Sequence, residues 1–299
     1  MKLLKSLLAL VMLVVMTTSC EKDSNSLLHD NYMELEYVGC FNYLNKKSVN
    51  QGVISTGTTY KFRWRADFTA DVYIKNAKFS VNMPNGIDID IEGLTWKNVD
   101  GVKTISAKDV VPTKVTFNGK EVDASEYVID AFNLDVFERR LMNGPLTYIP
   151  NINMSMEKGD IEVVTVQKQK VYFGSTGVTN NAESTNFTSK TPYYAVTLNP
   201  ETMEAVIDVY GARFAEAMLA VNMKFDGISF EVSNLGYTLS CEELIPTINE
   251  NGVAVPYPQY AITNLRGNAT FAKGLDLQFD CIGKFAVRAN LGYALPAEE

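Results

Sequence analysis

Three carboxylates in one short segment are the residues whose types and spacing come closest to a catalytic set. Asp88, Asp90 and Glu92 alternate with isoleucines, and a glycosidase needs only two acids placed across a cleft. The same alternation is typical of a strand with one buried and one solvated face. A second copy of the segment, described below, keeps a single acid at these positions, Glu231. We therefore expect a solvated strand face here and a protein that is not an enzyme.

Other catalytic groups are scarce in the sequence. The single histidine, His29, falls in a polar stretch near the N-terminus, so Ser-His-Asp, Cys-His and His-based zinc sites are not expected. The four cysteines are too dispersed for a thiolate cluster, and there is no glycine-rich phosphate loop. A net charge of −8 without a basic stripe argues against a nucleic-acid partner. We expect no metal and no cofactor.

Aromatic residues offer a different chemistry, the stacking of sugar rings or apolar ligands. Tyr60, Phe62 and Trp64 lie at strand spacing, but the second copy keeps these positions apolar without keeping them all aromatic, so we expect them in a core. Trp96 and Tyr237 occupy matching places at strand ends, where barrel mouths and sandwich rims contact ligands. These two residues are the candidate ligand contacts.

The cysteines also bear on the compartment. Cys241 and Cys281 both lie in the second copy, without a cysteine at the matching places in the first, and a secreted chain can be oxidised. We expect a Cys241–Cys281 disulfide, with two buried thiols as the alternative. Cys40 is expected to be a small buried apolar residue.

The elements that must position these residues come in two copies. Short segments recur in the same order at a nearly constant offset, far longer than the period of solenoid repeats. We therefore expect two tandem domains, residues 33–160 and 161–299, the second repeating the first. The matched segments are 81–83 with 221–223, 86–96 with 227–237, 105–113 with 239–247, 118–119 with 251–252, and 127–129 with 260–262.

Within both copies the hydrophobic period is two, and Asn-Gly and Asp-Gly turn pairs are frequent. The predicted fold class is all-β: two tandem, internally duplicated antiparallel domains, each closed as a β-barrel or packed as a β-sandwich. Periodicity leaves open which of the two forms. Residues 174–191, rich in Ser, Thr, Asn and Gly, are expected to form a mobile loop.

Residues 1–19 predict a signal peptide. Lys2 and Lys5 precede an apolar run that is shorter than the ~20 residues of a membrane-spanning helix. The small residues before Cys20 resemble the lipobox of bacterial lipoproteins, in which the cysteine carries the lipid, although Thr17 departs from the usual Leu or Val. Residues 20–32 are then the lipidated cysteine and a polar tether. This leader is similar to those of Bacteroidetes lipoproteins, where acidic residues after the cysteine mark surface export.

The leader and the strand pattern together resemble Bacteroidetes envelope lipoproteins of unknown function with tandem lipocalin-like (calycin-like) β-barrel domains. The pattern runs Val-Asn-Met, Gly-Ile-x-Ile, Leu-Ile-Pro or Val-Val-Pro, then Tyr-x-Ile. The resemblance implies a lipid-anchored outer-membrane protein, facing the periplasm or the cell surface, that binds a small apolar molecule or a glycan without catalysis. A structural fimbrillin-like or adhesin subunit is the alternative, and a carboxylate-dependent glycan hydrolase is the weakest of the three.

Overall fold

The computed structural model describes residues 32–37, 39–80, 82–137, 151–190, 192–214, 218–250 and 253–293, with side chains described from residue 39 on. The described residues from Met33 on belong to one compact unit. The predicted signal peptide, the lipid attachment at Cys20 and nearly all of the tether lie outside the described residues.

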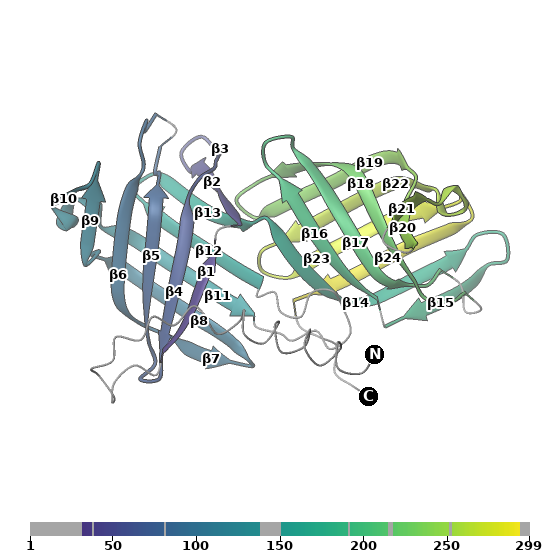
Figure 1. Cartoon of the computed structure of the whole chain (residues 1–299), viewed down its shortest axis with the longest axis horizontal. Helices are drawn as coiled ribbons and strands as arrows, with labels where there is room; N and C mark the ends of the chain where they lie inside the picture. The colour runs from purple at the N-terminus through teal and green to yellow at the C-terminus, as the bar shows by residue number, and fades with distance from the viewer. Residues whose placement is uncertain are drawn as a thin grey trace, which may run out of the picture. The chain divides into compact units, whose positions relative to one another are not determined.

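The first half of the chain forms two antiparallel sheets that share one core (Figure 1). In order across the sheet, one has β1 (Tyr32–Tyr37), β4 (Thr59–Arg65), β5 (Thr69–Ala77), β6 (Ile87–Thr95), β9 (Lys114–Phe117) and β10 (Lys120–Val122). The other has β3 (Gln51–Ser55), β2 (Cys40–Lys46), β13 (Ile161–Gln167), β12 (Asn151–Lys158), β11 (Ile129–Phe137), β8 (Val102–Val110) and β7 (Lys97–Val99). A 3-10 helix, η1 (Ala124–Tyr127), precedes β11.

The second half closes an eight-stranded antiparallel barrel (Figure 1). Its order is β14 (Gln169–Asn180), β16 (Tyr193–Asn199), β17 (Glu204–Ala212), β18 (Val221–Val232), β19 (Gly236–Leu244), β22 (Ile262–Thr270), β23 (Gly274–Cys281) and β24 (Phe285–Gly292), which pairs with β14. Outside this ring, β15 (Thr185–Ser189) pairs with β14, and the hairpin of β20 (Thr247–Glu250) and β21 (Val253–Pro256) joins β18. A second 3-10 helix, η2 (Pro258–Tyr260), precedes β22.

These elements confirm the predicted all-β fold. The two halves also repeat one order of elements, as the recurring sequence segments predict. In both, a long strand (β6 or β18) precedes the next core strand (β8 or β19), then a short hairpin, a 3-10 helix and three consecutive neighbouring strands. The repeated Tyr-x-Ile segments mark the same place, since η1 ends at Tyr127 before Ile129 begins β11, and η2 ends at Tyr260 before Ile262 begins β22.

Two local differences decide that only the second half is a closed barrel. β14 is continuous, pairing with β16 over residues 169–173 and with β24 over residues 173–180, whereas its counterpart in the first half is divided into β1 and β2, in different sheets. On the other side, β18 pairs directly with β19, while in the first half the short strand β7 occupies an edge of β8. The first half is therefore a pair of facing sheets.

Two sequence-based expectations differ from the structure. The boundary expected after residue 160 assigns β13 to the second half, but β13 pairs with β12 and β2 and so lies in the first-half sheet. The repeated segments stop well before this strand, so they did not define where a copy ends. The stretch 174–191, expected to be a mobile loop, instead contains the end of β14 and all of β15, joined in a hairpin.

The expected core strands are buried as the alternation predicts. Tyr60, Phe62 and Trp64 on β4 are 1–3% exposed and line up along the strand, with neighbouring ring centroids 6.4 Å apart. The Tyr60 hydroxyl donates to Asn42 Oδ1 at 2.6 Å and accepts from Thr165 at 3.0 Å, so burying it leaves no unpaired polar group. The first-half core thus binds β4 to the opposite sheet through β2 and β13.

Candidate binding groove on the outer face of the barrel

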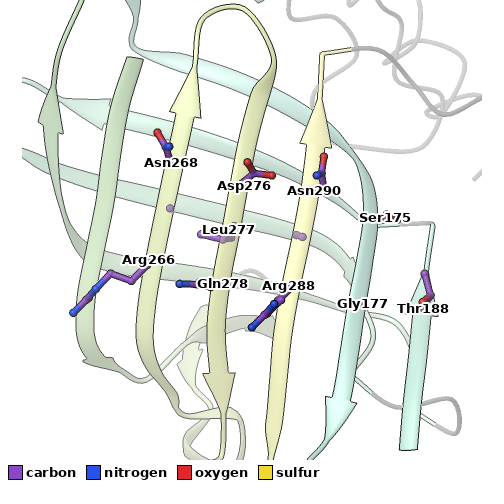
Figure 2. A pocket seen from close by; sticks show the side chains of 12 residues that line it. Ser175, Gly177, Thr188, Arg266, Asn268, Asp276, Leu277, Gln278, Arg288 and Asn290 are labelled. Atoms are coloured by element: carbon purple, nitrogen blue, oxygen red, sulfur yellow. The ribbon is translucent and has the colours of Figure 1, made fainter. Parts of the chain in front are cut away.

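A groove of about 610 Å³ runs over the outer face of the barrel, across β22, β23, β24 and β14 and up to β15 (Figure 2). Most of its lining is polar, with a few glycine and apolar residues at the floor. The lining residues are Ser175, Gly177, Thr188, Arg266, Gly267, Asn268, Asp276, Leu277, Gln278, Arg288, Ala289 and Asn290.

Strand alternation places these polar side chains outside the barrel. On β23, Leu275, Leu277 and Phe279 face the core and are 1–3% exposed, while the intervening Asp276 and Gln278 are exposed. β22 and β24 alternate in the same sense, so four neighbouring strands present one continuous polar surface.

The strand register arranges the polar side chains in two rows across the strands. The first row runs Arg266, Gln278, Arg288 and Gly177, each paired with the next across adjacent strands. The second row, two residues along, runs Asn268, Asp276, Asn290 and Ser175. Figure 2 shows the two rows side by side on the same face.

Gly177 keeps the end of the first row open. A Cβ built on it would meet only the backbone oxygen of Arg288, at 3.8 Å, which is ordinary contact, and its φ lies outside the left-handed region. Neither steric crowding nor backbone conformation therefore requires a glycine. A glycine in a strand interior marks a bulge, a bend, or a close approach by a ligand or another backbone, and the pairing of β14 with β24 and β15 shows no bulge here.

The charges of the groove lie on Arg266, Arg288 and Asp276, and all three side chains are exposed. Arg266 Nη1 donates to the backbone oxygen of Leu265 at 2.9 Å, which holds that guanidinium against the sheet. Within the described part of the chain, neither guanidinium forms an ion pair with a carboxylate. The first row is therefore cationic, and the second carries one negative charge.

This arrangement suits hydrogen bonding to a polar ligand. The guanidinium and amide groups supply N–H donors in fixed planes, and the amide oxygens, the hydroxyls and Asp276 supply acceptors. Glycoside hydrolysis needs a pair of carboxyl groups, and Asp276 is the only one among the residues that line the groove.

The structure places the two predicted ligand contacts in different surroundings. Trp96 is half-buried after β6, where its Nε1 donates to the backbone oxygen of Thr69 at 3.1 Å and its ring meets Trp64 edge-on. Tyr237 is 3% exposed inside the barrel, and its hydroxyl is 2.7 Å from that of Tyr172. Neither residue lines the outer groove.

The expected Cys241–Cys281 disulfide is absent, since Cys40, Cys241 and Cys281 are all free thiols. Cys241 lies on β19 and Cys281 on β23, with β22 between them. Two interstrand spacings are ~9.5 Å, beyond the ~7 Å that a disulfide tolerates between Cα atoms. The expectation rests on the presence of two cysteines in the second copy without counterparts in the first, and the order of the strands rules this pairing out.

The three carboxylates of the first half form no catalytic pair across a cleft. Asp88 lies 3.2 Å from Lys75 and accepts from the backbone N–H of Asn76 at 3.0 Å, and Glu92 is exposed. Among the described residues, no group of three or more His, Cys, Asp and Glu side chains is placed to hold a metal ion. No helix within the described ranges is long and apolar enough to span a membrane.

Two buried charged residues were not anticipated from the sequence. Asp71 is fully buried at a β-bulge, where it accepts from Arg65 at 2.5 Å and from the backbone N–H of Gly93 at 3.1 Å. Lys170 is 1% exposed on β14. The sequence does not predict the burial of either residue. Alternation indicates which positions face the core, but it does not indicate whether a charged side chain at such a position finds a hydrogen-bond partner there.

The outer groove was also missed, although part of it was predictable. Outward polar residues at alternate positions of 266–290 follow from the strand pattern, but their alignment into rows depends on the register between strands. Because the sequence predicts a loop over residues 174–191, it does not assign Ser175, Gly177 and Thr188 to the face of a strand. Comparisons of the chain with protein-family models, curated protein sequences and solved structures each found no match.

Proposed function

We propose that this chain is a lipid-anchored bacterial envelope protein that binds a glycan in the outer groove of its barrel and releases it unchanged. The observation that carries the proposal is the pair of polar rows on the groove face. Their side chains offer aligned hydrogen-bond donors and acceptors, and at Gly177 no side chain covers the backbone of β14. The leader, with its lipobox-like sequence ending at Cys20, supports an outer-membrane location facing the periplasm or the cell surface.

The interior of the barrel favours a glycan over a small apolar ligand. An eight-stranded barrel is wide enough for its own side chains or for one small ligand. Here Phe279 packs edge-on against Phe225 and Phe214, with ring centroids 5.5 and 5.8 Å away, and all three are at most 3% exposed. Side chains thus occupy this space, whereas the outer groove is open and polar.

The alternative, a fimbrillin-like subunit, has less support. Donor-strand exchange requires a sheet with an unfilled strand position. Each of the eight described strands of the barrel has a paired neighbour on both sides, so the barrel itself has no unfilled strand position, whereas the edges of the two first-half sheets are open. The absence of a carboxylate pair in the groove likewise favours binding over glycan hydrolysis.

The proposal is tested by blocking the groove. Gly177→Tyr places a large side chain over the first row, and its Cβ has room. We expect it to weaken the binding of oligosaccharides that the wild-type protein selects from a glycan array by at least about 10-fold, measured by calorimetry. Ser229→Tyr, at an exposed position of β18 outside the groove, is the matched control.

Two further measurements complete the test. Equal melting temperatures establish that both variants are folded, and chromatography of the incubated oligosaccharide is expected to recover it intact. Affinity unchanged in Gly177→Tyr, or cleavage of the ligand, contradicts the proposal.

A further inference from the structure

The outer groove has a charge pattern that goes beyond general glycan binding. Its first row carries two guanidinium groups, Arg266 and Arg288, in a chain whose net charge is −8. The two arginines lie on β22 and β24 with β23 between them, so their Cα atoms are about 10 Å apart. Figure 2 shows both side chains on the groove face, with Gln278 between them.

The arginines of the first row are set apart from the one carboxylate of the groove. Within the described part of the chain no carboxylate pairs with either guanidinium, although Asp276 lies on the same face. Asp276 is displaced by two residues along β23, into the second row between Asn268 and Asn290. The groove therefore keeps its positive and negative charges in separate rows.

The two rows have different ligand preferences. Arginine binds planar or tetrahedral anionic groups through parallel N–H donors, and such charge-assisted hydrogen bonds are stronger than neutral ones. A row of Asn, Asp, Asn and Ser side chains suits hydroxyl groups, which donate to the carboxylate and exchange hydrogen bonds with amides. A ligand that satisfies both rows carries anionic groups along one edge and hydroxyls along the other.

We propose that the ligand of the groove is an acidic oligosaccharide, whose anionic groups bind Arg266 and Arg288 while its hydroxyls bind the Asn268–Asp276–Asn290 row. The inference rests on the proposed function. Carboxylate, sulfate and phosphate substituents share the chemistry that the arginines recognise.

The test compares an oligogalacturonate with its fully methyl-esterified form, which has the same backbone without the charges, and with a sulfated galactan oligosaccharide. We expect the wild-type protein to bind at least one acidic form about 10-fold or more tightly than the ester. The ratio of the carboxylate and sulfate affinities then distinguishes the two anions.

Three substitutions separate charge recognition from the integrity of the groove. Arg288→Gln is expected to lower affinity for the acidic form about 3- to 10-fold and affinity for the ester by a clearly smaller factor, because only the acidic form loses a charge-assisted hydrogen bond. Asp276→Asn weakens a hydrogen bond from a ligand hydroxyl for both forms and removes a like charge for the acidic form alone, so it is expected to increase the ratio of acid to ester affinity. Arg63→Gln, on β4 of the first half, removes the same positive charge elsewhere and is expected to have no effect.

The outcomes of this test and of the groove-blocking test can be told apart. Equal affinity of acid and ester, or equal losses of both in Arg288→Gln, overturns the acidic-ligand inference. If Gly177→Tyr still blocks a neutral glycan in that case, the proposed function stands. If no glycan binds the wild-type protein, the proposed function and this inference both fail.

Discussion

At the scale of single residues, Lys170 is the least expected feature of the protein. Its ammonium donates to Asn153 Oδ1 and lies 5.3 and 5.1 Å from the ring centroids of Phe271 and Tyr293. Burial lowers the pKa of Lys170 to about 7. The titratable groups that face it, Cys40 and Tyr293, have pKa values raised by burial, to about 12 for Cys40, and are therefore neutral at pH 7. No carboxylate among the described residues compensates its charge.

The lowered pKa of Lys170 predicts that the stability of the protein depends on pH. The pKa of Lys170 is lower in the folded protein than in the unfolded chain, so the unfolded chain binds more protons above pH 7 and stability rises with pH. We expect the free energy of unfolding to increase by up to about 1.4 kcal/mol per pH unit between about pH 7 and 8.5. Above that range, ionisation of cysteines in the unfolded chain acts in the opposite direction.

The measurement is urea unfolding at several pH values. Lys170→Met, which keeps the length of the side chain without the charge, is expected to flatten this slope. Lys168→Met, at a half-buried position two residues earlier, is expected to retain it. Identical slopes in the wild-type protein and Lys170→Met would show that Lys170 does not titrate in this range.

At the scale of elements, the continuity of β14 is what closes the barrel. Near Gly174 the pairing partner of β14 changes from β16 to β24. A Cβ on Gly174 would lie 2.2 Å from the backbone oxygen of Asn290 and 3.0 Å from Leu291 Cα. Backbone atoms cannot move aside as a flexible side chain does, so the close approach of β14 to β24 requires a glycine here.

Replacing either of two glycines of β14 by alanine is therefore expected to have opposite effects on the free energy of unfolding. Gly174→Ala is expected to lower the free energy of unfolding by about 2 kcal/mol or more, because it pushes β14 from β24. Gly177→Ala has room for its Cβ and is expected to leave stability unchanged or raise it by up to about 1 kcal/mol. Thermal and urea unfolding of both variants give the comparison. A Gly174→Ala protein as stable as the Gly177→Ala protein would contradict this account of closure.

At the scale of the whole molecule, the proposed function depends on attachment to a membrane. The apolar run before Cys20 and the polar residues 21–32 are the sequence basis for a lipid anchor and tether. We expect metabolic labelling with a fatty acid to mark the wild-type protein in a bacterial host with lipoprotein processing. Cys20→Ala is expected to lose the label and to leave the membrane fraction, whereas Cys40→Ala is expected to keep both. Equal labelling of wild type and Cys20→Ala contradicts the anchor.

The sequence by itself determined the all-β class, the strand alternation and the repeated order of elements. These properties depend on local periodicity and on turn residues, which one chain displays directly. The buried faces of β4, with Tyr60, Phe62 and Trp64, and of β6, with Ile87 and Ile89, were predictable for this reason.

Only the tertiary structure decided the rest, because it depends on pairing between strands distant in the chain. The second half closes into a barrel because β14 is one continuous strand. The first half stays open because the corresponding strand is divided into β1 and β2 and because β7 occupies the edge of β8. Strand order separates Cys241 from Cys281 by β22. The interstrand register brings Arg266 and Arg288 into one row with Gly177, and places Lys170 where none of the described carboxylates compensates its charge. Alternation within a strand specifies which face a side chain takes, and only the neighbouring strands specify what lies beside it.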